Sequence, residues 1–140
     1  MPASIWAEQR QKALSEVRTD AAFEGIGYDI DPAAVALANA NAKLAGVGER
    51  CRFEVADVKD FTAADAATVL TNPPYGERML EQRSAQQLMR QFGRHLRFAD
   101  GWKKYIISSE PEFEHYFGKQ ATKKRKLYNG RLQCNVYMYF

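Results

Sequence analysis

The stretch Thr71-Asn72-Pro73-Pro74-Tyr75-Gly76 follows an apolar run, Ala67-Thr-Val-Leu70, and sets the interpretation of the rest of the chain. Proline fixes φ and has no N–H, and a residue that precedes proline is pushed toward extended backbone. The stretch should therefore be stiff and should offer carbonyl acceptors, with the side-chain oxygen of Asn72 as one more. The sequence predicts a polar notch at the carboxyl end of a strand; the alternative is an ordinary proline-rich turn.

A notch of this kind is suited to holding a planar amine. An exocyclic NH2 group has two protons, and two acceptors that bind both protons draw the nitrogen lone pair out of conjugation with the ring. The nitrogen then becomes a better nucleophile. Tyr75 can stack on the ring face, a contact worth roughly 1–3 kcal/mol for a nucleobase. We therefore predict that the catalytic residues are Asn72, Pro73, Pro74 and Tyr75.

An acidic residue ends a predicted strand farther upstream. The segment 25–29 (Gly-Ile-Gly-Tyr-Asp) is expected to be a short buried strand, followed by a helix with Asp31 as its N-cap and Pro32 at its first position. Gly46 should end that helix. Asp29 then lies at the carboxyl end of the strand, where an acid in an open α/β sheet can accept ribose hydroxyls. The alternative for Asp29 is a turn-forming carboxylate, and Asp31 is expected to act only as the cap.

The next predicted strand, within residues 52–58, delivers a second acid. Phe53 and Val55 share a parity, as residues of a strand would, and Asp57 follows the carboxyl end. Three successive strands thus place Asp29, Asp57 and Asn72 at one edge of a sheet. One acid could hold a ribose, the other could accept from an adenine amine, and the asparagine could hold the acceptor substrate.

These motifs resemble the S-adenosylmethionine-dependent amino-methyltransferases. The chain is most similar to the bacterial large-subunit ribosomal RNA guanine-N2 methyltransferases that carry an N-terminal THUMP domain. The resemblance rests on Gly27-Tyr-Asp-Ile-Asp-Pro32, on Asn72-Pro-Pro-Tyr-Gly-Glu-Arg78 and on the tail from Lys126-Leu-Tyr-Asn-Gly130 to Cys134. It covers nearly the whole chain. DNA adenine and protein glutamine methyltransferases share only the Asn-Pro-Pro-Tyr piece.

The resemblance implies a role for each matching residue. Asp29 would bind the ribose of S-adenosylmethionine, Ile30 would pack on its adenine, and Asp57 would accept from the adenine amine beside the backbone of Val58. Asn72, Pro73 and Tyr75 would hold the target base. Methyl transfer at a sulfonium depends on positioning more than on acid–base help, so no metal is expected. The implied partner is ribosomal RNA and the implied location is the cytoplasm.

The family's first strand and glycine-rich loop should precede Asp29, and no such pattern is present upstream of it. Residues 1–24 instead predict a helical insert segment with an apolar stripe that includes Ile5, Trp6, Leu14 and Val17. Residues 25–140 would be the C-terminal part of a methyltransferase catalytic domain. The expected fold is α/β: a Rossmann-like class I methyltransferase sheet with a C-terminal antiparallel hairpin, lacking the first strand. A longer chain would supply the missing segment or the THUMP domain, and the isolated chain is expected to bind cofactor poorly.

Composition sets broad limits. The 140 residues suit one domain or part of one, and the net charge of +3 is mildly basic. No apolar run is long enough to cross a membrane, and no signal-peptide pattern is present at the start. Cys51 and Cys134 are too few and too far apart for a metal framework, and reduced thiols in a cytosolic protein are the expected state.

Basic residues cluster in two places. Lys123, Lys124, Arg125 and Lys126 form one run, for which contact with RNA phosphates is the favoured interpretation. A second set of arginines follows the notch: Arg78, Arg83, Arg90, Arg94 and Arg97. This second set is equally consistent with RNA contact and with a solvated helix face. Other readings of the chain remain open: a non-catalytic RNA-binding remnant, a protein-glutamine methyltransferase and a DNA adenine methyltransferase.

The remaining elements follow from periodicity. We expect a helix over 84–98, a strand over 102–108 and a short helix over 112–117. Asn129-Gly130 between two strand-like segments, 123–128 and 131–139, predicts a hairpin. The aromatic residues near the C-terminus are expected in the core or at a sheet edge, and His95 and His115 are expected to be structural or exposed.

Overall fold

The computed structural model describes residues 3–18, 20–61, 67–74, 79–96 and 101–140. Tyr75 and the Gly76-Glu77-Arg78 extension lie outside these ranges, as does Arg97. The elements follow one another in the order α1 (Ala3–Ser15), β1 (Gly25–Asp29), α2 (Pro32–Leu44), β2 (Cys51–Val55), the 3-10 turn η1 (Val58–Asp60), β3 (Thr68–Thr71), α3 (Met79–Leu96), β4 (Lys103–Ser108), α4 (Phe113–Phe117), β5 (Lys123–Asn129) and β6 (Leu132–Tyr139).

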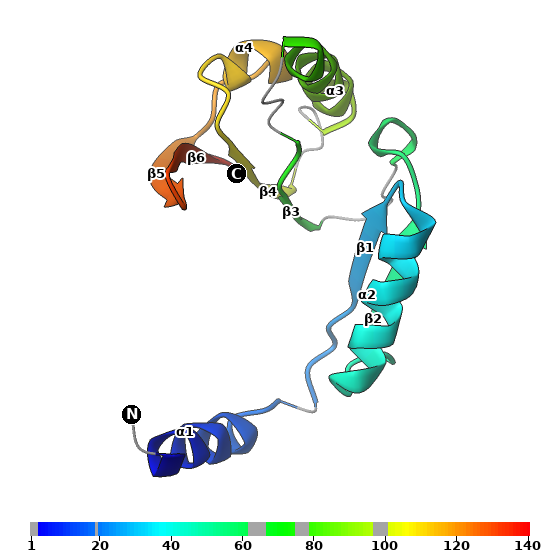
Figure 1. Cartoon of the computed structure of the whole chain (residues 1–140), viewed down its shortest axis with the longest axis vertical. Coiled ribbons are helices and arrows are strands. Elements are labelled where there is room, and N and C mark those ends of the chain that lie inside the picture. The colour runs from blue at the N-terminus through cyan, green and yellow to red at the C-terminus, as the bar shows by residue number, and fades with distance from the viewer. Residues whose placement is uncertain (1–2, 19, 62–66, 75–78, 97–100) are drawn as a thin grey trace.

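The described strands form two separate sheets (Figure 1). In the first sheet β1 pairs in parallel with β2. The second sheet has the order β3-β4-β6-β5, in which β3 and β4 are parallel while β6 is antiparallel to both of its neighbours. Among the described strands, β1 and β3 are therefore not hydrogen-bonded to each other. We call the space between their unpaired edges the seam. The parallel strands and the antiparallel C-terminal hairpin agree with the α/β fold expected from the sequence.

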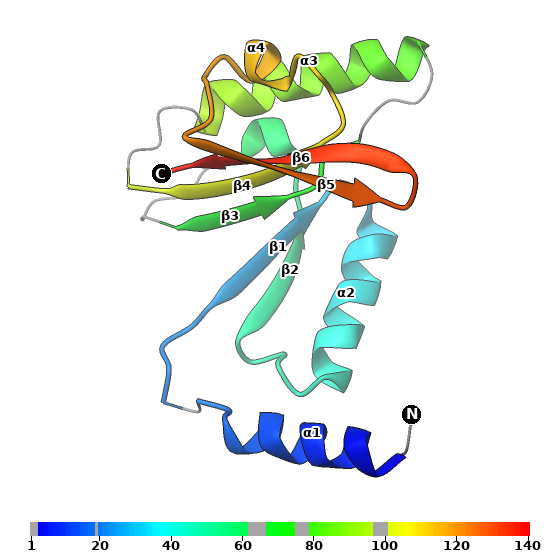
Figure 2. The same cartoon turned by 90° about the vertical axis from the view of Figure 1, so that its left-hand side faces the viewer.

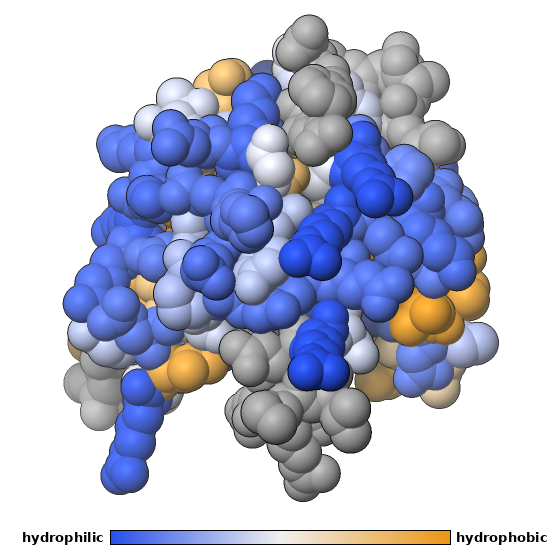
Figure 3. Space-filling view, turned by 90° about the horizontal axis from the view of Figure 1, so that it is seen from above, coloured by the Kyte–Doolittle hydropathy of each residue, from blue (hydrophilic) through white to orange (hydrophobic). Residues whose placement is uncertain are grey.

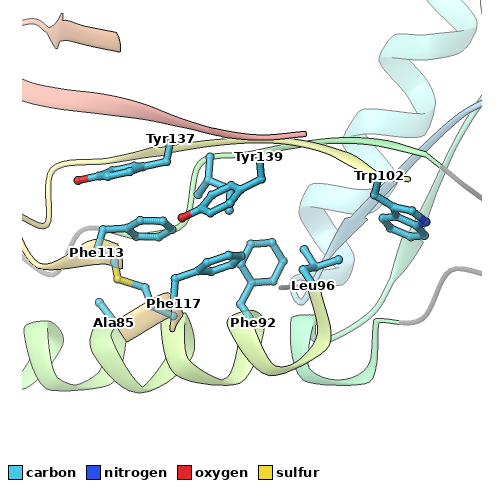
Figure 4. Packing of buried hydrophobic residues seen from close by; sticks show 10 residues of the cluster. Ala85, Phe92, Leu96, Trp102, Phe113, Phe117, Tyr137 and Tyr139 are labelled. Carbon is cyan, nitrogen blue, oxygen red and sulfur yellow. The ribbon is translucent and has the colours of Figure 1, made fainter. Parts of the chain in front are cut away.

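Helices α3 and α4 cover one face of the four-stranded sheet (Figure 2). Between helices and sheet lies a cluster of buried aromatic and aliphatic side chains (Figure 4). The ring centroids of Phe113 and Tyr137 are 4.4 Å apart, and those of Phe117 and Tyr139 are 4.8 Å apart. Both tyrosine hydroxyls donate to backbone carbonyls, at 3.2 Å and 3.1 Å, so burial leaves neither hydroxyl unsatisfied. Most of the molecule's buried apolar surface is in this half.

A glycine allows α3 and α4 to pack closely. A Cβ atom added at Gly93 would lie 2.1 Å from the carbonyl oxygen of Phe117, which is backbone and cannot swing aside. The rings of Phe92 and Phe117 meet edge to face beside this crossing, with centroids 6.1 Å apart. The position of α4, and with it the loop that follows β4, therefore depends on the absence of a side chain at residue 93.

The two-stranded half has a much smaller core. Helix α2 packs on β1 and β2, but Val35 and Ala42 are its only fully buried side chains. Asn39 fastens the helix to the sheet: its amide nitrogen donates to the carbonyl of Phe53 at 2.8 Å, and its oxygen accepts from the N–H of Phe53 at 3.1 Å. Asn39 thus satisfies the outer edge of β2, as a neighbouring strand would.

Aromatic rings connect the two halves. Tyr28 of β1 meets Phe61 edge to face at 5.4 Å between centroids, and Phe61 meets Trp102, just before β4, at 6.2 Å. The exposed fractions of apolar side chains on the strands that border the seam remain high: 40% for Ile26 and 76% for Leu70. The rings therefore join the halves on one side while the strands themselves stay unpaired.

Helix α1 confirms the helix predicted near the N-terminus. Its apolar residues are exposed, with Trp6 and Leu14 each at 63%, and the helix stands apart from the sheets in both views (Figures 1 and 2). The division into an insert segment (1–24) and a catalytic part (25–140) stays a prediction.

Two sequence-based predictions need correction, one on a helix boundary and one on burial. Helix α3 begins at Met79, not at Ser84, because Met79-Leu-Glu-Gln-Arg83 consists of strong helix formers that extend it toward the notch. The strand over 25–29 was predicted to be buried, but the residues of β1 are half-buried or exposed, because one edge of the strand has no partner among the described residues. The shared parity of Phe53 and Val55 is confirmed, since both lie in β2. The hairpin was predicted correctly, with Gly130 at φ +61° in its turn.

Candidate functional site

The predicted acids lie side by side at the carboxyl edge of the first sheet. Asp29 is the last residue of β1 and pairs in register with Val55 of β2; the N–H of Ala56 donates to its carbonyl at 3.0 Å. Asp57 follows one residue later. The prediction that these two acids share one edge is therefore confirmed. Asn72 follows the carboxyl end of β3, which belongs to the other sheet, so no ladder fixes its position relative to the acids.

A short chain of Asx hydrogen bonds shapes the turn after β1. The Oδ1 atom of Asp29 accepts from the N–H of Asp31 at 2.9 Å, and the Oδ1 atom of Asp31 accepts from the N–H of Ala33 at 2.9 Å. Asp31 is thus the N-cap of α2, as predicted. Asp29 is exposed and, within the described part of the chain, Oδ2 has no hydrogen bond. The turn-forming interpretation of Asp29 is therefore confirmed, and its role as an acceptor for a ribose hydroxyl stays a prediction.

Asp57 has a local role that the sequence interpretation missed. Its Oδ1 atom accepts from the N–H of Lys59 at 3.0 Å and caps η1, while Oδ2 lies 3.0 Å from the Lys59 ammonium. The backbone hydrogen bond from Lys59, followed by its side chain, lowers the pKa of Asp57 below the usual value. The carboxylate therefore stays ionised at neutral pH and can accept a further hydrogen bond. The signal in the sequence was the Asp-Val-Lys spacing of a capped turn.

The residues beside the acids differ in what they can offer. The Ile30 side chain is 69% exposed and stands at the edge between Asp29 and α2. Val58 is half-buried and packs against the core cluster, so its side chain faces inward and its backbone is the part available at the edge. The apolar contact from Ile30 and the backbone contact from Val58 stay predictions.

The notch itself is partly described. Asn72 and Pro74 are exposed, and Pro73 is half-buried. Val69 of β3 packs against the core cluster, which ties the start of the notch to the well-packed half. Tyr75, predicted to stack on the target base, lies outside the described residues.

A buried carboxylate at the end of β4 was not predicted. Glu110 is 7% exposed; its oxygens accept from Gln86 Nε2 at 3.3 Å and from the N–H of Glu112 at 3.1 Å. Its own N–H donates to the Ser108 hydroxyl oxygen at 3.1 Å. These bonds hold the middle of α3 against the loop after β4. In the sheet, β4 is the neighbour of β3, the strand that leads into the notch. Ser-Ser-Glu-Pro after an apolar strand was the available signal.

The basic run on β5 is exposed, and one of its cations, Lys124, is neutralised by an ion pair. The Lys124 ammonium lies 2.7 Å from Oε2 of Glu114. The Lys126 ammonium lies 5.5 Å from the centroid of the Tyr128 ring, which is within the range of a cation–π interaction. The hydrogen bond that the Lys124 ammonium donates to Glu114 raises the pKa of Lys124. Lys123, Arg125 and Lys126 are therefore the residues of this run that remain available to a polyanion.

The described residues offer neither a membrane-spanning helix nor a cluster of metal ligands. None of the described helices has the length and apolarity needed to cross a bilayer. Within the same residues, histidine, cysteine and acidic side chains do not gather into a group of three or more that could hold a metal ion. Cys51 and Cys134 are both free thiols, and Cys134 is buried.

Comparison with known proteins places the chain in a family. The family model described as UPF0020, "RMKL-like, methyltransferase domain", matches residues 2–138. The chain belongs to this family. The resemblance drawn from the Asn-Pro-Pro-Tyr notch and the two acids is therefore confirmed.

Individual relatives extend the comparison. The chain is 34% identical over 137 residues to "Putative RNA methyltransferase YpsC" of Bacillus subtilis, covering 97% of this chain and 36% of that protein. It is 38% identical over 117 residues to "Ribosomal RNA large subunit methyltransferase K/L" of Syntrophotalea carbinolica, covering 79% of this chain and 16% of that protein. The chain thus spans about a third or less of these two relatives.

A solved structure supports the fold and the cofactor class. The crystal structure of "SMU.472, a putative methyltransferase complexed with SAH" superposes with a TM-score of 0.87 at 28% sequence identity, covering all of this chain and 37% of that one. The match confirms the α/β fold, and the bound SAH, together with the family, confirms the predicted S-adenosylmethionine-dependent class.

Proposed function

We propose that this chain is the part of an S-adenosylmethionine-dependent RNA methyltransferase that holds the nucleoside end of the cofactor and the target amine, and that the target is guanine N2 in ribosomal RNA. The observation that carries the proposal is the placement of Asp29 and Asp57 at one sheet edge, together with the Asn72-Pro-Pro notch that follows β3, the next strand in the chain and part of the other sheet. The names of the two relatives above support an RNA substrate.

The two acids fit the nucleoside of the cofactor. Asp29 keeps one carboxylate oxygen for a ribose hydroxyl, since its other oxygen forms the turn. Asp57 is held ionised by Lys59 and can accept from the adenine amine, while exposed Ile30 supplies an apolar contact to the adenine. Hydrogen bonds to a charged acceptor contribute roughly 1.5–3 kcal/mol each. When bound, S-adenosylmethionine supplies an electrophilic methyl group on a sulfonium sulfur.

The notch acts on the amine. The side-chain oxygen of Asn72 accepts one amine proton, and a backbone carbonyl of the proline segment accepts the other. Two acceptors orient the nitrogen lone pair away from the ring and toward the methyl group. The N–C bond would form as the bond between methyl carbon and sulfur breaks, with that electron pair left on sulfur, and the proton lost from nitrogen would pass to solvent. Because the prolines carry no N–H, the segment offers the amine acceptors and few donors. The residue-specific roles, including stacking by Tyr75, are part of the proposal.

The seam between β1 and β3 bears on whether this chain acts alone. Both strands leave one edge without a partner among the described residues, and unpaired backbone groups are costly when buried. We infer that a further strand with a glycine-rich loop occupies the seam in the active protein and completes the cofactor site. The competing function, an RNA-binding remnant without catalysis, is the one that an unfilled seam would favour.

The experiment uses the full-length protein with large-subunit ribosomal RNA and methyl-labelled S-adenosylmethionine, followed by digestion to nucleosides. The proposal predicts label in N2-methylguanosine. Asn72→Ala should lower kcat by about 10²–10³-fold, the loss typical of removing one positioned hydrogen-bonding group from a transition state. The matched control Asn41→Ala removes an exposed asparagine on α2 and should leave kcat unchanged. RNA binding without any label transfer would support the remnant, and near-full activity of Asn72→Ala would overturn the role of Asn72.

A further inference from the structure

Helix α3 has two opposite faces of different character. Residues 85, 89, 92 and 96 are buried in the core cluster. Arg83, Gln87, Arg90 and Arg94 follow one another at helical spacings of four, three and four, which places them on the side directly away from the core. All four are exposed. The outer face is therefore a stripe of three arginines and one glutamine.

This stripe has one sign of charge. From Arg83 to Leu96 the helix contains no aspartate or glutamate, whereas an ordinary solvated face mixes both signs. The face of the molecule seen over α3 and α4 is predominantly hydrophilic (Figure 3). Arg94 lies in the last turn, where a cation also stabilises the helix dipole, but that effect does not explain Arg83 in the second turn.

One arginine is already oriented. The guanidinium of Arg90 lies over the ring of Tyr116 of α4, 5.0 Å from the ring centroid, and the Tyr116 hydroxyl contacts Glu112 at 3.3 Å. Stacking on a ring fixes the plane of a guanidinium while leaving its N–H edge open to a planar anion. The Glu112 carboxylate is engaged by this tyrosine hydroxyl. Arg90 is thus held in a geometry suited to a phosphate.

The stripe also has a definite position relative to the candidate site. Helix α3 follows the Asn72-Pro-Pro notch in the chain, and Gln86 is tied to Glu110 in the loop at the carboxyl end of β4. Arg83, one turn before Gln86, therefore lies toward the site, and Arg94 lies about 16 Å farther along the axis at 1.5 Å per residue. A strand of nucleic acid places several phosphates within that length.

We propose that Arg83, Arg90 and Arg94 form a track for the phosphate backbone of the RNA segment next to the target base. The proposal rests on the proposed function, because it assumes an RNA substrate at the notch, and it adds a surface for that substrate. Arginine suits this role better than lysine, since its planar fork binds a phosphate through two parallel N–H bonds. The track would hold the flanking strand while the notch holds the amine.

The test measures the affinity of the full-length protein for ribosomal RNA fragments against salt concentration. Each phosphate contact to single-stranded RNA contributes about 0.7 to the slope of log K against log salt. Changing all three arginines to glutamine should reduce the slope by about 2, so a variant that matches the parent at 1 M salt would bind about 100-fold more weakly than the parent at 0.1 M. The matched control, Arg10→Gln with Lys12→Gln and Lys43→Gln, removes three exposed cations elsewhere and should leave the slope unchanged.

Two more variants separate charge from packing. Arg83→Gln with Arg94→Gln keeps the Arg90–Tyr116 contact and should still reduce the slope by about 1.4. Changing all three arginines to lysine keeps the charge and should retain most of the slope. When the rate of methyl transfer is measured against the concentration of a short RNA, the glutamine variants should show a higher KM for that RNA. Their kcat at saturating RNA should stay within about twofold of the parent value. An unchanged slope in the triple glutamine variant, or an equal loss in the control, would overturn the track. Absence of any methyl transfer by the parent protein would instead count against the proposed function.

Discussion

The two halves of the molecule differ in how they are held together. The four-stranded half, with α3 and α4, buries aromatic rings in a continuous cluster in which tyrosine hydroxyls find backbone partners (Figure 4). The two-stranded half relies on Val35, Ala42 and the side-chain bonds of Asn39. Full burial of a large apolar side chain contributes about 1.5–3 kcal/mol, so stability is concentrated in the four-stranded half. The proposed cofactor acids lie on the weaker half, and the proposed amine site begins on the stronger half.

This contrast has a physical consequence for function. A half with few buried contacts opens more easily, and ligand-binding segments are often of this kind. Filling the seam beside β1, or binding the cofactor at its edge, would stabilise the weaker half by mass action. The amine notch, anchored through Val69 to the core cluster, should keep its place whether or not the cofactor half is ordered.

The largest change in stability should come from Gly93→Ala. The added methyl group would collide with the backbone of Phe117, and neither α3 nor α4 can shift without disturbing the cluster. Overpacking of this kind costs about 1–3 kcal/mol and occasionally more, and the backbone contact places this site at the upper end. Urea unfolding followed by Trp102 fluorescence in a Trp6→Phe background would measure it.

The matched change in the weaker half is Gly27→Ala. Its added Cβ would lie 2.4 Å from an atom of the Phe53 ring, which is a half-buried side chain and can turn. We expect a loss of about 1 kcal/mol, below that of Gly93→Ala. Equal losses for the two alanine variants would contradict the contrast between the halves.

Asn39→Ala tests the fastening of α2. Both the N–H and the carbonyl of Phe53 would lose their partner, and each unsatisfied group costs about 1–3 kcal/mol when it stays buried. We expect a loss of about 2 kcal/mol together with faster amide exchange along β2, while β4 and β6 exchange unchanged. Asn41→Ala, on the exposed side of the same helix, should cost nothing measurable. Slower unfolding or unchanged exchange in Asn39→Ala would show that the helix is held by other means.

The smallest effect concerns the ion pair between α4 and β5. Burial acts to raise the pKa of Glu114, but hydrogen bonds from Lys124 and from the N–H of Ala121 outweigh it and hold the pKa below 4.5. A lowered pKa in the folded state means that the stabilisation is present above pH 4.5 and disappears as the pH falls through the lowered value.

Glu114→Gln should therefore cost up to about 1 kcal/mol at pH 7, with the difference from the parent shrinking toward pH 3. Glu49→Gln, at an exposed position in the other half, should leave the stability profile unchanged. A difference that grows as the pH falls would have the wrong sign for this account.

Local signals in the sequence predicted much of this structure. The Asn129-Gly130 turn, the Asp31 cap and the Gly46 stop each depend on a few adjacent residues, and each is present. The adjacency of Asp29 and Asp57 followed from strand parity and parallel pairing. These features need no knowledge of distant contacts.

Other features depend on contacts between distant segments, which local patterns do not contain. Gly93 is an unremarkable helix residue until α4 crosses it, and Asn39 is one of several asparagines until β2 lies beside it. Glu110 is buried only because α3 and β6 close over it. The position of Asn72 relative to the acids was not predictable for a related reason: among the described residues β1 and β3 lie in separate sheets, so no ladder fixes one against the other.

The most direct test of the account compares cofactor binding and turnover in two variants of the full-length protein. Asp29→Ala should weaken S-adenosylmethionine binding by about 10- to 100-fold, the loss of one charged hydrogen bond, as measured by calorimetry. Asn72→Ala should leave that affinity within about twofold and lower kcat by about 100-fold or more. If Asn72→Ala instead weakens cofactor binding as much as Asp29→Ala does, or keeps near-full turnover, then it is wrong to assign cofactor binding to the two-stranded half and the amine site to the four-stranded half.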